Sequence, residues 1–395
     1  MSITVISIII ILVILSFIAY INFDYTSKYK KTEKDLYYEA LDLLIAGKLR
    51  EAYATLLALI KNDTSNVKAY LKLGQVLREI GNPERALKIH RSLLIRKDLT
   101  TYENIELLRN IALDYKYLKK INDSITQCLD ILKIEKKNEW ALLQLIDLYK
   151  SIDDWNSSQK YLEIYQKITG NLDSRILGLY LIKQGQIEFN KQDFIMARSL
   201  FEEGLNMHNE LAIAYKLIGD TYSEESEVEY QKSKEEGNEH PTEEAKELLS
   251  KALLMWIKYA QHKPMYSNNV MHLIKDSLFA LDRYSELEHI LKDLVERDSN
   301  NISALITLAD YYSLQGENEK SINLLDSLKG KEKESILPRM VRLRLRFNIS
   351  ENVTDEMKDE FNNLTNEMSK VNHIHPSALQ DEDSEWLSEN EYFKN

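Results

Sequence analysis

The sequence is poor in cysteine. Cys128 is the single cysteine among 395 residues, so no disulfide can form within one chain and no site with four thiolate ligands can be built. A lone cysteine is typical of a reducing compartment. His373 and His375 form the only closely spaced histidine pair, and two such ligands in a polar segment rarely hold a metal ion. We therefore expect neither a metal nor a cofactor.

Glycine and proline are also scarce, at 11 and 5 residues. No glycine-rich phosphate loop follows a strand-like segment, and no nucleophile elbow appears, so we predict no catalytic residues and no enzyme activity. The net charge of −12 and the lack of a basic face with interleaved aromatics argue against nucleic acid as a partner. With 44% hydrophobic and 29% charged residues, the composition favours an all-α protein of short helices and tight turns.

A helical hairpin can be recognised in residues 73–94, LGQVLREIGNPERALKIHRSLL, where apolar residues recur at helical spacing on both sides of a turn. Gly81 suits the left-handed conformation that ends a helix, Asn82 suits the cap of the next helix, and Pro83 suits its first turn. The segment predicts two short amphipathic helices folded against each other.

The same hairpin pattern recurs along the sequence. Gly74 and Ala86 lie 34 residues after Ala40 and Ala52, and the tetratricopeptide (TPR) pattern has a period of about 34 residues. The same pair of positions is filled further along by Ala112 and Ser124, Ile146 and Ser158, Gly185 and Ala197, and Ala309 and Ser321. We predict a TPR-type α-solenoid of about eight repeats over residues 33–330.

Other segments interrupt or follow this array. An acidic insertion at residues 223–247 splits the sixth repeat and is expected to extend its helices around a loop. Residues 331–370 read as two degenerate capping helices, and residues 371–395 as an acidic, disordered tail. Within the tail, SEWLSENEYF is either a short docking motif or a solvated stretch.

The amino terminus has the one long hydrophobic run. Residues 3–21 carry no charge and, at about 1.5 Å per residue, just span a bilayer core of about 30 Å. We predict a transmembrane anchor at 1–22 and a basic juxtamembrane linker at 23–32, which places the amino terminus outside and the repeats in the cytoplasm. A cleaved signal peptide is the rival interpretation, but no Lys or Arg precedes the run and no small-x-small site ends it.

The first helices of successive hairpins are expected to line a groove. Its residues by register are Lys68, Lys72, Gln75, Arg78, Arg109, Asn110, Lys116, Trp140, Gln144 and Lys150. This cationic, amide-bearing strip is a candidate site for an acidic or carboxyl-terminal peptide. The alternative is that these side chains only keep the solenoid soluble. His90 and Cys128 share one register position and are expected to be packing residues, and Trp256, in the position of Phe201, is expected in the core.

The order of anchor, basic flank, AYLKLGQVLREIGNPERALKIHRSLLIRKDLT and divergent repeats resembles the lipopolysaccharide assembly protein B family of bacterial inner-membrane TPR proteins. The resemblance covers roughly residues 1–330 and is closest at 69–165. The residues that carry it are Gly74, Arg78, Gly81, Arg85, Ala86, Ile89, His90 and Asp98–Thr100. That family ends in a rubredoxin-like zinc ribbon with two Cys-x-x-Cys pairs, which a sequence with one cysteine lacks.

This resemblance implies a single-pass, non-catalytic adaptor of the bacterial inner (plasma) membrane that acts in lipopolysaccharide assembly. It implies protein partners, among them a membrane AAA+ protease and the deacetylase that commits precursors to lipid A, whose regulated proteolysis the adaptor assists. The runner-up hypothesis is a receptor that captures chaperone-bound or exported proteins by acidic carboxyl termini at Lys72, Arg78 and Arg109. Self-association is left open.

Overall fold

The computed structural model describes residues 13–18, 32–237, 240–299, 301–326, 336–349, 353–370 and 381–389, and the regular structure in these ranges is helical throughout. The chain divides into two compact units, residues 1–169 (unit 1) and 170–395 (unit 2), which we describe separately. The sequence had predicted one continuous solenoid over 33–330. Across residues 169 and 170 the equivalent positions of successive first helices, Ile146 and Gly185, lie 39 residues apart, which is longer than the 34 residues of the regular repeat.

The predicted transmembrane anchor lies largely outside the described residues. Of residues 1–22 only 13–18 are described, and they are helical. Of the predicted basic linker, only Thr32 is described, and it caps the helix that begins at Glu33. Within the described ranges, no helix combines the length and the apolar character that crossing a membrane requires.

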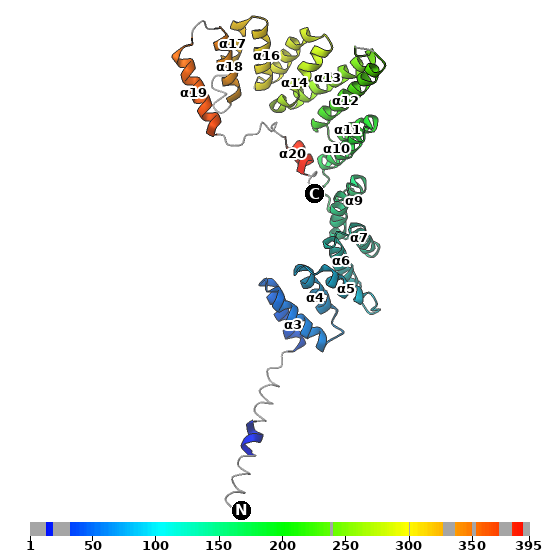
Figure 1. The fold of residues 1–395 in the computed structure, drawn as a ribbon. Helices are drawn as coiled ribbons and strands as arrows, with labels where there is room; N and C mark the ends of the chain where they lie inside the picture. Colours follow the sequence, from blue (N-terminus) through cyan, green and yellow to red (C-terminus); the bar gives the residue numbers. More distant parts are fainter. Residues whose placement is uncertain are drawn as a thin grey trace, which may run out of the picture. The chain divides into compact units, whose positions relative to one another are not determined.

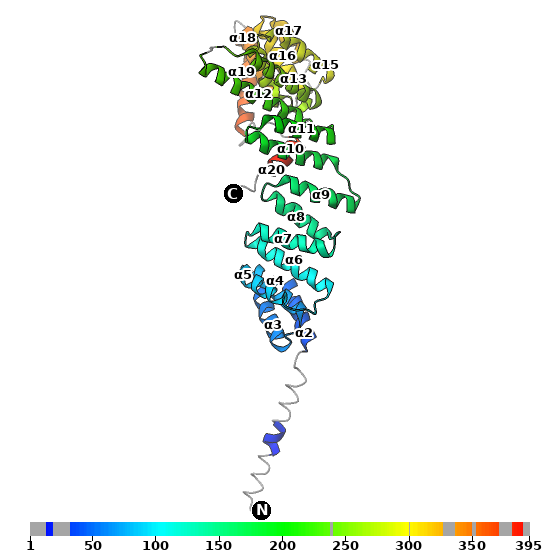
Figure 2. The same cartoon turned by 90° about the vertical axis from the view of Figure 1, so that its right-hand side faces the viewer.

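Unit 1 consists of helical hairpins stacked in sequence order (Figures 1 and 2). Its described helices are α2 (Glu33–Ile45), α3 (Leu49–Asn62), α4 (Val67–Glu79), α5 (Pro83–Leu93), α6 (Thr101–Tyr117), α7 (Ile121–Ile134), α8 (Glu139–Lys150) and α9 (Trp155–Thr169). Gly81 has φ +90° and Pro83 opens α5, as predicted. Asn82 is the N-cap residue of α5, but its side chain makes no capping hydrogen bond, so that part of the prediction was wrong.

Unit 2 continues the hairpin pattern with longer and more varied helices. It contains α10 (Ser174–Asn190), α11 (Phe194–Met207), α12 (Ile213–Glu235), α13 (Glu243–His262), α14 (Asn268–Ala280), α15 (Leu287–Arg297), α16 (Ile302–Leu314), α17 (Asn318–Asp326), α18 (Ile336–Ile349), α19 (Asp355–Lys370) and α20 (Glu382–Glu389), with short 3-10 helices η1 (Pro264–Tyr266) and η2 (Tyr284–Glu286). Within the acidic segment 223–247, residues 223–235 form the end of α12 and residues 243–247 the start of α13; these helices are 23 and 20 residues long.

The predicted register is visible in the contacts between paired helices. Ser124, Ser158 and Ser321 each donate a hydrogen bond from Oγ to the backbone carbonyl 12 residues earlier, at distances of 2.8, 2.9 and 2.6 Å. These serines fill one register position in three different repeats. Serine is small enough to stand where Ala52 and Ala86 stand in other repeats, and its hydroxyl donor is satisfied by a carbonyl. The repeats therefore share one packing geometry.

Glycine is required where a large side chain crosses the hairpin. A Cβ atom on Gly74 would lie 2.2 Å from Nε2 of His90. In unit 2, a Cβ on Gly219 would lie 2.6 Å from Nε1 of Trp256. Neither contact is sterically possible without a shift, so these glycines make room for the ring that packs on them.

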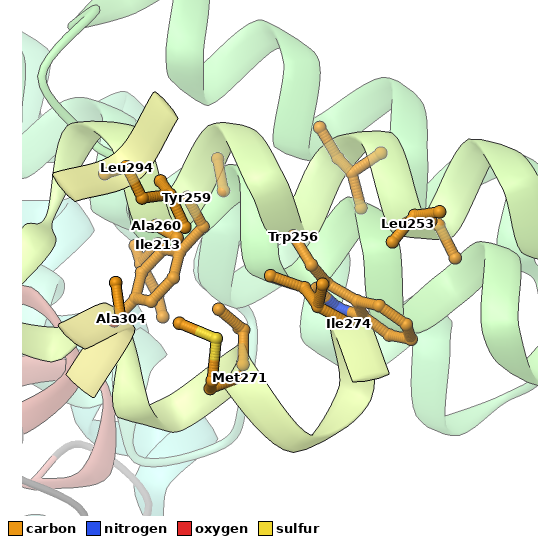
Figure 3. Close-up of a cluster of buried hydrophobic side chains, with 14 of the residues drawn as sticks. Ile213, Leu253, Trp256, Tyr259, Ala260, Met271, Ile274, Leu294 and Ala304 are labelled. Carbon is orange, nitrogen blue, oxygen red and sulfur yellow. The ribbon is translucent and has the colours of Figure 1, made fainter. Parts of the chain in front are cut away.

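The core of unit 2 confirms the prediction for Trp256, which is 2% exposed. Figure 3 shows its indole beside Ile274, while Tyr259 lies further along α13 near Leu294. The indole Nε1 donates a 3.0 Å hydrogen bond to Oδ1 of Asp220, so the polar end of the ring is satisfied within an apolar cluster. Burial raises the pKa of Tyr259 to about 12.

The carboxyl-terminal segment differs from the prediction. Residues 371–395 were expected to be a disordered acidic tail, but Glu382–Glu389 forms α20, which packs on α10 (Figures 1 and 2). Residues 371–380 and 390–395 lie outside the described ranges. The prediction of disorder was wrong for α20 because it counted acidic residues and missed two anchors. Leu387 joins the apolar core of unit 2, and Asp383 forms an ion pair with Arg175.

Candidate partner-binding site

Unit 1 contains a hollow of about 470 Å³ between the first helices of three successive hairpins, α2, α4 and α6. Six of the ten groove residues predicted from the sequence line it: Lys68, Lys72, Gln75, Arg78, Arg109 and Asn110. The lining also includes Tyr37, Leu71, Tyr102, Glu106 and Leu113, which the sequence reasoning did not name. We call this set the unit 1 hollow.

The register explains both the predicted and the missed lining residues. Lys72 and Asn110 each stand two residues before the small residue of their first helix, Gly74 or Ala112. The other lining positions repeat in the same way. Tyr37, Leu71 and Arg109 share one position, Lys68 and Glu106 a second, and Gln75 and Leu113 a third. Four of the five missed residues could thus have been found by carrying each predicted position through every repeat. Tyr102, an exposed residue in the first turn of α6, could not.

The hollow is predominantly basic, with four cationic side chains and one carboxylate, Glu106. Lys72 Nζ donates to Gln75 Oε1 at 2.9 Å, and Gln75 Nε2 donates to Glu79 Oε1 at 2.8 Å. This chain of hydrogen bonds along α4 fixes the direction of the lysine. A preoriented ammonium loses less conformational entropy when it binds an anion.

Arg109 is held from two sides. Its Nη1 lies 3.4 Å from Glu106 Oε1, and its guanidinium stacks over the ring of Trp140 with 4.7 Å to the centroid. Stacking leaves the edge of the guanidinium available for a planar carboxylate. Burial, and secondarily the charge of Tyr102, raise the pKa of Tyr37, so its hydroxyl remains a donor at neutral pH.

Arg78 has a structural role within this set. Its side chain is 6% exposed, and Nη1 lies 2.6 Å from Oδ1 of the fully buried Asp114. The same nitrogen donates to the Asn110 carbonyl at 3.3 Å. Since Asp114 neutralises its charge, Arg78 positions α4 against α6 at the base of the hollow.

His90 completes this buried cluster. It was expected to be a packing residue, and its contact with Gly74 agrees with that, but it also makes polar contacts. Nδ1 lies 2.5 Å from Asp114 Oδ2, and Nε2 lies 3.2 Å from the Leu71 carbonyl. The cluster joins α4, α5 and α6 through one carboxylate. The signal in the sequence was Asp114 itself, an acidic residue on the apolar face of its helix.

The other four predicted groove residues lie on α6 and α8 and do not line the hollow. Lys116 Nζ donates to Gln144 Oε1 at 3.4 Å, and Lys150 Nζ lies 3.9 Å from Asp147 Oδ1. The ring of Trp140 stacks against the guanidinium of Arg109. Their part in partner binding stays a prediction.

Groups suited to metal binding or nucleophilic chemistry do not gather here. Among the residues that the structure describes, no three His, Cys, Asp or Glu side chains come together as metal ligands, and His373 and His375 lie outside those residues. Cys128 is fully buried, as expected of a packing residue, and burial raises its thiol pKa to about 12. The arrangement is suited to non-covalent recognition of an anionic group.

The repeat register, the shared hairpin packing and a hollow lined by successive first helices define a helical-repeat protein of the tetratricopeptide type. No protein-family model matches the chain. A stretch of 135 residues is 25% identical to lipopolysaccharide assembly protein B from Escherichia coli K12, and the same values hold for that protein from strain O6:H1. The match covers 33% of this chain and 33% of each relative, so the chain spans about a third of the length of the curated relatives it matches.

Solved structures that resemble this chain include two tetratricopeptide repeat proteins. A tetratricopeptide repeat protein from Parabacteroides merdae shares 13% identity, with a TM-score of 0.28 and coverage of 91% of this chain and 98% of that one. The carboxyl-terminal part of a TPR repeat-containing protein from Cytophaga hutchinsonii shares 12% identity, with a TM-score of 0.34 and coverage of 67% and 96%. We base the fold on the register and contacts of this chain.

Proposed function

We propose that this chain is a non-catalytic adaptor that binds an acidic segment of a partner protein in the unit 1 hollow. The observation that carries the proposal is the convergence of Lys68, Lys72 and Arg109 on one hollow whose base is fixed by the Arg78–Asp114 ion pair. Carboxylates pair well with such groups, and extended acidic or carboxyl-terminal peptides are recognised in this way.

The hollow offers apolar and amide contacts beside the charges. Leu71 and Leu113 supply apolar surface, while Gln75 and Asn110 supply amides that can bond to a peptide backbone. A volume of about 470 Å³ suits several side chains of a peptide. Specificity would come from the spacing of the acidic groups, because the three cations stand on separate helical turns of α4 and α6.

The proposal includes a tether at a bacterial inner membrane through residues 1–22, with the repeats in the cytoplasm. Support comes from the uncharged run at 3–21 and from residues 13–18, where Val13 and Phe17 are 63% and 62% exposed. Apolar side chains left so exposed need a lipid or protein environment. Tethering raises the effective concentration of a captured partner near membrane enzymes, so a weak contact in the hollow suffices.

The similarity to lipopolysaccharide assembly protein B supports placing this adaptor in lipopolysaccharide assembly. In this form of the proposal, the partners are a membrane AAA+ protease and a lipid A biosynthetic deacetylase whose proteolysis the adaptor assists. The second candidate is a receptor for chaperone-bound or exported proteins with acidic carboxyl termini. The basic hollow supports this candidate equally, because acidic carboxyl termini would pair with the same cations. This candidate requires no membrane enzyme as partner.

The test is capture of partners by crosslinking in native membranes, followed by mass spectrometry. The full chain is compared with Lys72→Glu/Arg109→Glu and with a control of equal charge change at exposed positions, Lys61→Glu/Lys133→Glu. We expect the control to capture the same proteins as wild type and the hollow variant to lose them. Unchanged capture by the hollow variant would refute the proposed site. Reproducible absence of a protease and a lipid A enzyme among the proteins captured would refute the lipopolysaccharide role.

A further inference from the structure

Helix α20 is only eight residues long, Glu382–Glu389, and it follows α19 after eleven intervening residues. A helix this short is not stable alone in water, so its contacts with the rest of unit 2 must hold it. Asp383, Trp386 and Leu387 stand at positions i, i+3 and i+4 and therefore share one helical face. This face contacts the rest of unit 2, including α10.

Two basic side chains of α10 hold the ends of this face. Arg175 Nε and Nη2 donate to Asp383 Oδ1 at 2.8 and 2.7 Å, and Lys263 Nζ lies 4.0 Å from Oδ2. Lys183 Nζ donates to the Leu387 carbonyl at 3.2 Å. That carbonyl belongs to the last turn of α20, where no backbone amide of the helix remains to bond it. The lysine therefore acts as a carboxyl-terminal cap supplied by another helix.

The apolar part of the face is also matched. Leu387 is 4% exposed within the core cluster of unit 2, and the ring of Trp386 lies 5.8 Å from that of Tyr180. A hollow of about 360 Å³ adjoins the start of α20 and is lined by Arg175, His208, Glu210, Lys263 and Tyr266 together with Asp381–Asp383. One surface of unit 2 thus supplies the ion pair to Asp383, the cap for the Leu387 carbonyl and the apolar contacts of Trp386 and Leu387.

The register relates this surface to the unit 1 hollow. Lys183 stands two residues before Gly185, as Lys72 stands two residues before Gly74. Lys72 faces the unit 1 hollow, whereas Lys183 binds the backbone of α20. The equivalent row of positions in unit 2 is therefore a recognition surface with an acidic helix already bound to it.

We propose that the surface formed by Arg175, Tyr180, Lys183 and Lys263 is a second peptide-binding site, specific for a short acidic helix with the anchors Asp-x-x-Trp-Leu. Residues 381–389 of the same chain occupy it as an intramolecular competitor, and a partner protein that presents the same anchors binds by displacing them. This inference goes beyond the proposed function, because it concerns unit 2 and stands or fails independently of the unit 1 hollow.

The tether makes such a competitor effective but exchangeable. Connection through about ten residues raises the effective concentration of a segment to the order of millimolar. If the tethered helix itself binds with a Kd of about 0.1 mM, that effective concentration weakens the apparent binding of an external peptide by about tenfold. A partner with a longer or tighter helix overcomes this factor, whereas chance acidic segments do not.

The test measures binding of a fluorescein-labelled peptide, DEDSEWLSE, to the full chain by anisotropy. The opened variant is Trp386→Ala/Leu387→Ala, and Glu385→Ala, an exposed position on α20, is the matched control. We expect the opened variant to bind the peptide about tenfold more tightly than wild type and the control. Adding Arg175→Glu/Lys183→Glu to the opened variant should abolish binding.

Equal binding by wild type and the opened variant would overturn intramolecular competition. Binding that survives Arg175→Glu/Lys183→Glu would overturn the assigned site, and no binding by any version would overturn the peptide specificity. Occlusion that weakens on dilution of wild type would show that α20 comes from a second copy and contradict the intramolecular assignment.

A second measurement needs no variant. Excess labelled peptide, distinguishable by mass, should accelerate amide hydrogen exchange of residues 384–389 in the wild-type chain. Unchanged exchange would show that α20 is a fixed part of the core.

Discussion

The two units use the same register position in different ways. Lys72 in unit 1 is directed by Gln75 into a basic hollow, while Lys183 in unit 2 bonds to the chain's own helix α20. The backbone framework around both lysines is the same helical hairpin. We infer from this comparison that the repeats supply a row of positions suited to recognition, and that the side chains on that row decide what is bound.

The units also differ in the side chain that packs on the glycine at one equivalent register position. In unit 1, His90 packs on Gly74 and joins an ion cluster with Asp114 and Arg78. In unit 2, Trp256 packs on Gly219 within an apolar cluster. A buried ion cluster adds little net stability but is costly to break, whereas an apolar cluster gains stability in proportion to the area it buries. Mutations should therefore lower the free energy of unfolding of the two units for different reasons: loss of ion pairing in unit 1 and disturbed apolar packing in unit 2.

The largest effect is expected from Asp114→Ala, which leaves Arg78 and His90 without their shared carboxylate. Removing one partner of a buried ion pair costs about 3–5 kcal/mol. Unit 1 should open while unit 2 stays folded, and alkylation of Cys128 reports this, because its thiol is buried in unit 1. Asp130→Ala, whose partner Lys133 is exposed, serves as the control. Alkylation as slow as in wild type would contradict this account of the cluster.

In unit 2 the corresponding change is Gly219→Ala, which places a methyl group against the indole of Trp256. Overpacking of this kind costs about 1–3 kcal/mol. Urea unfolding of the full chain should show the unit 2 transition shifted to lower urea, with Cys128 alkylation unchanged. Leu254→Ala, at a half-exposed position of the neighbouring helix, should shift it by no more than about 0.5 kcal/mol. Equal shifts for both variants would mean that the glycine is not required by packing.

Exchanging the charge at the equivalent lysines separates the two recognition surfaces. Lys72→Glu should weaken partner binding to unit 1 at least about tenfold, or about 1.4 kcal/mol, and leave α20 docked. Lys183→Glu should release α20, seen as faster hydrogen exchange at residues 384–389, and leave unit 1 binding unchanged. If either variant produced both effects, the surfaces would not be independent.

The smallest effect is the response to alkaline pH. Burial raises the pKa of Tyr259 in unit 2 from 10.0 to about 12, so the folded state retains a proton that the unfolded state loses. Stability from this group is fully present below pH 10 and declines as the pH rises from about 10 to 12. Tyr259→Phe should make the unit 2 urea transition less sensitive to pH in that window. An unchanged pH dependence would show that Tyr259 does not contribute.

Much of the fold was predictable because TPR packing is local. Gly74, Ala86, Gly81 and Pro83 specify one hairpin, and their recurrence predicts the next. The position of the hollow followed from the same register, and so did most of its lining. The prediction from composition was wrong for α20. Counting acidic residues does not reveal that Asp383 pairs with Arg175, a residue 208 positions earlier.

One other feature depends on contacts that the repeat pattern does not contain. Asp114 makes His90 and Arg78 a single cluster, although each residue alone reads as packing or groove. Pairwise chemistry between repeats, rather than the repeat itself, determines this cluster.

The most direct test of the central claim is site-specific photocrosslinking in native membranes from Tyr102, an exposed residue that lines the unit 1 hollow. The control probe replaces Glu51, an exposed residue on α3. We predict a protein adduct from position 102 that is absent from position 51 and is lost with Lys72→Glu/Arg109→Glu. Equal adducts from both positions, or an adduct that survives the charge reversal, would contradict the claim that the hollow binds the partner.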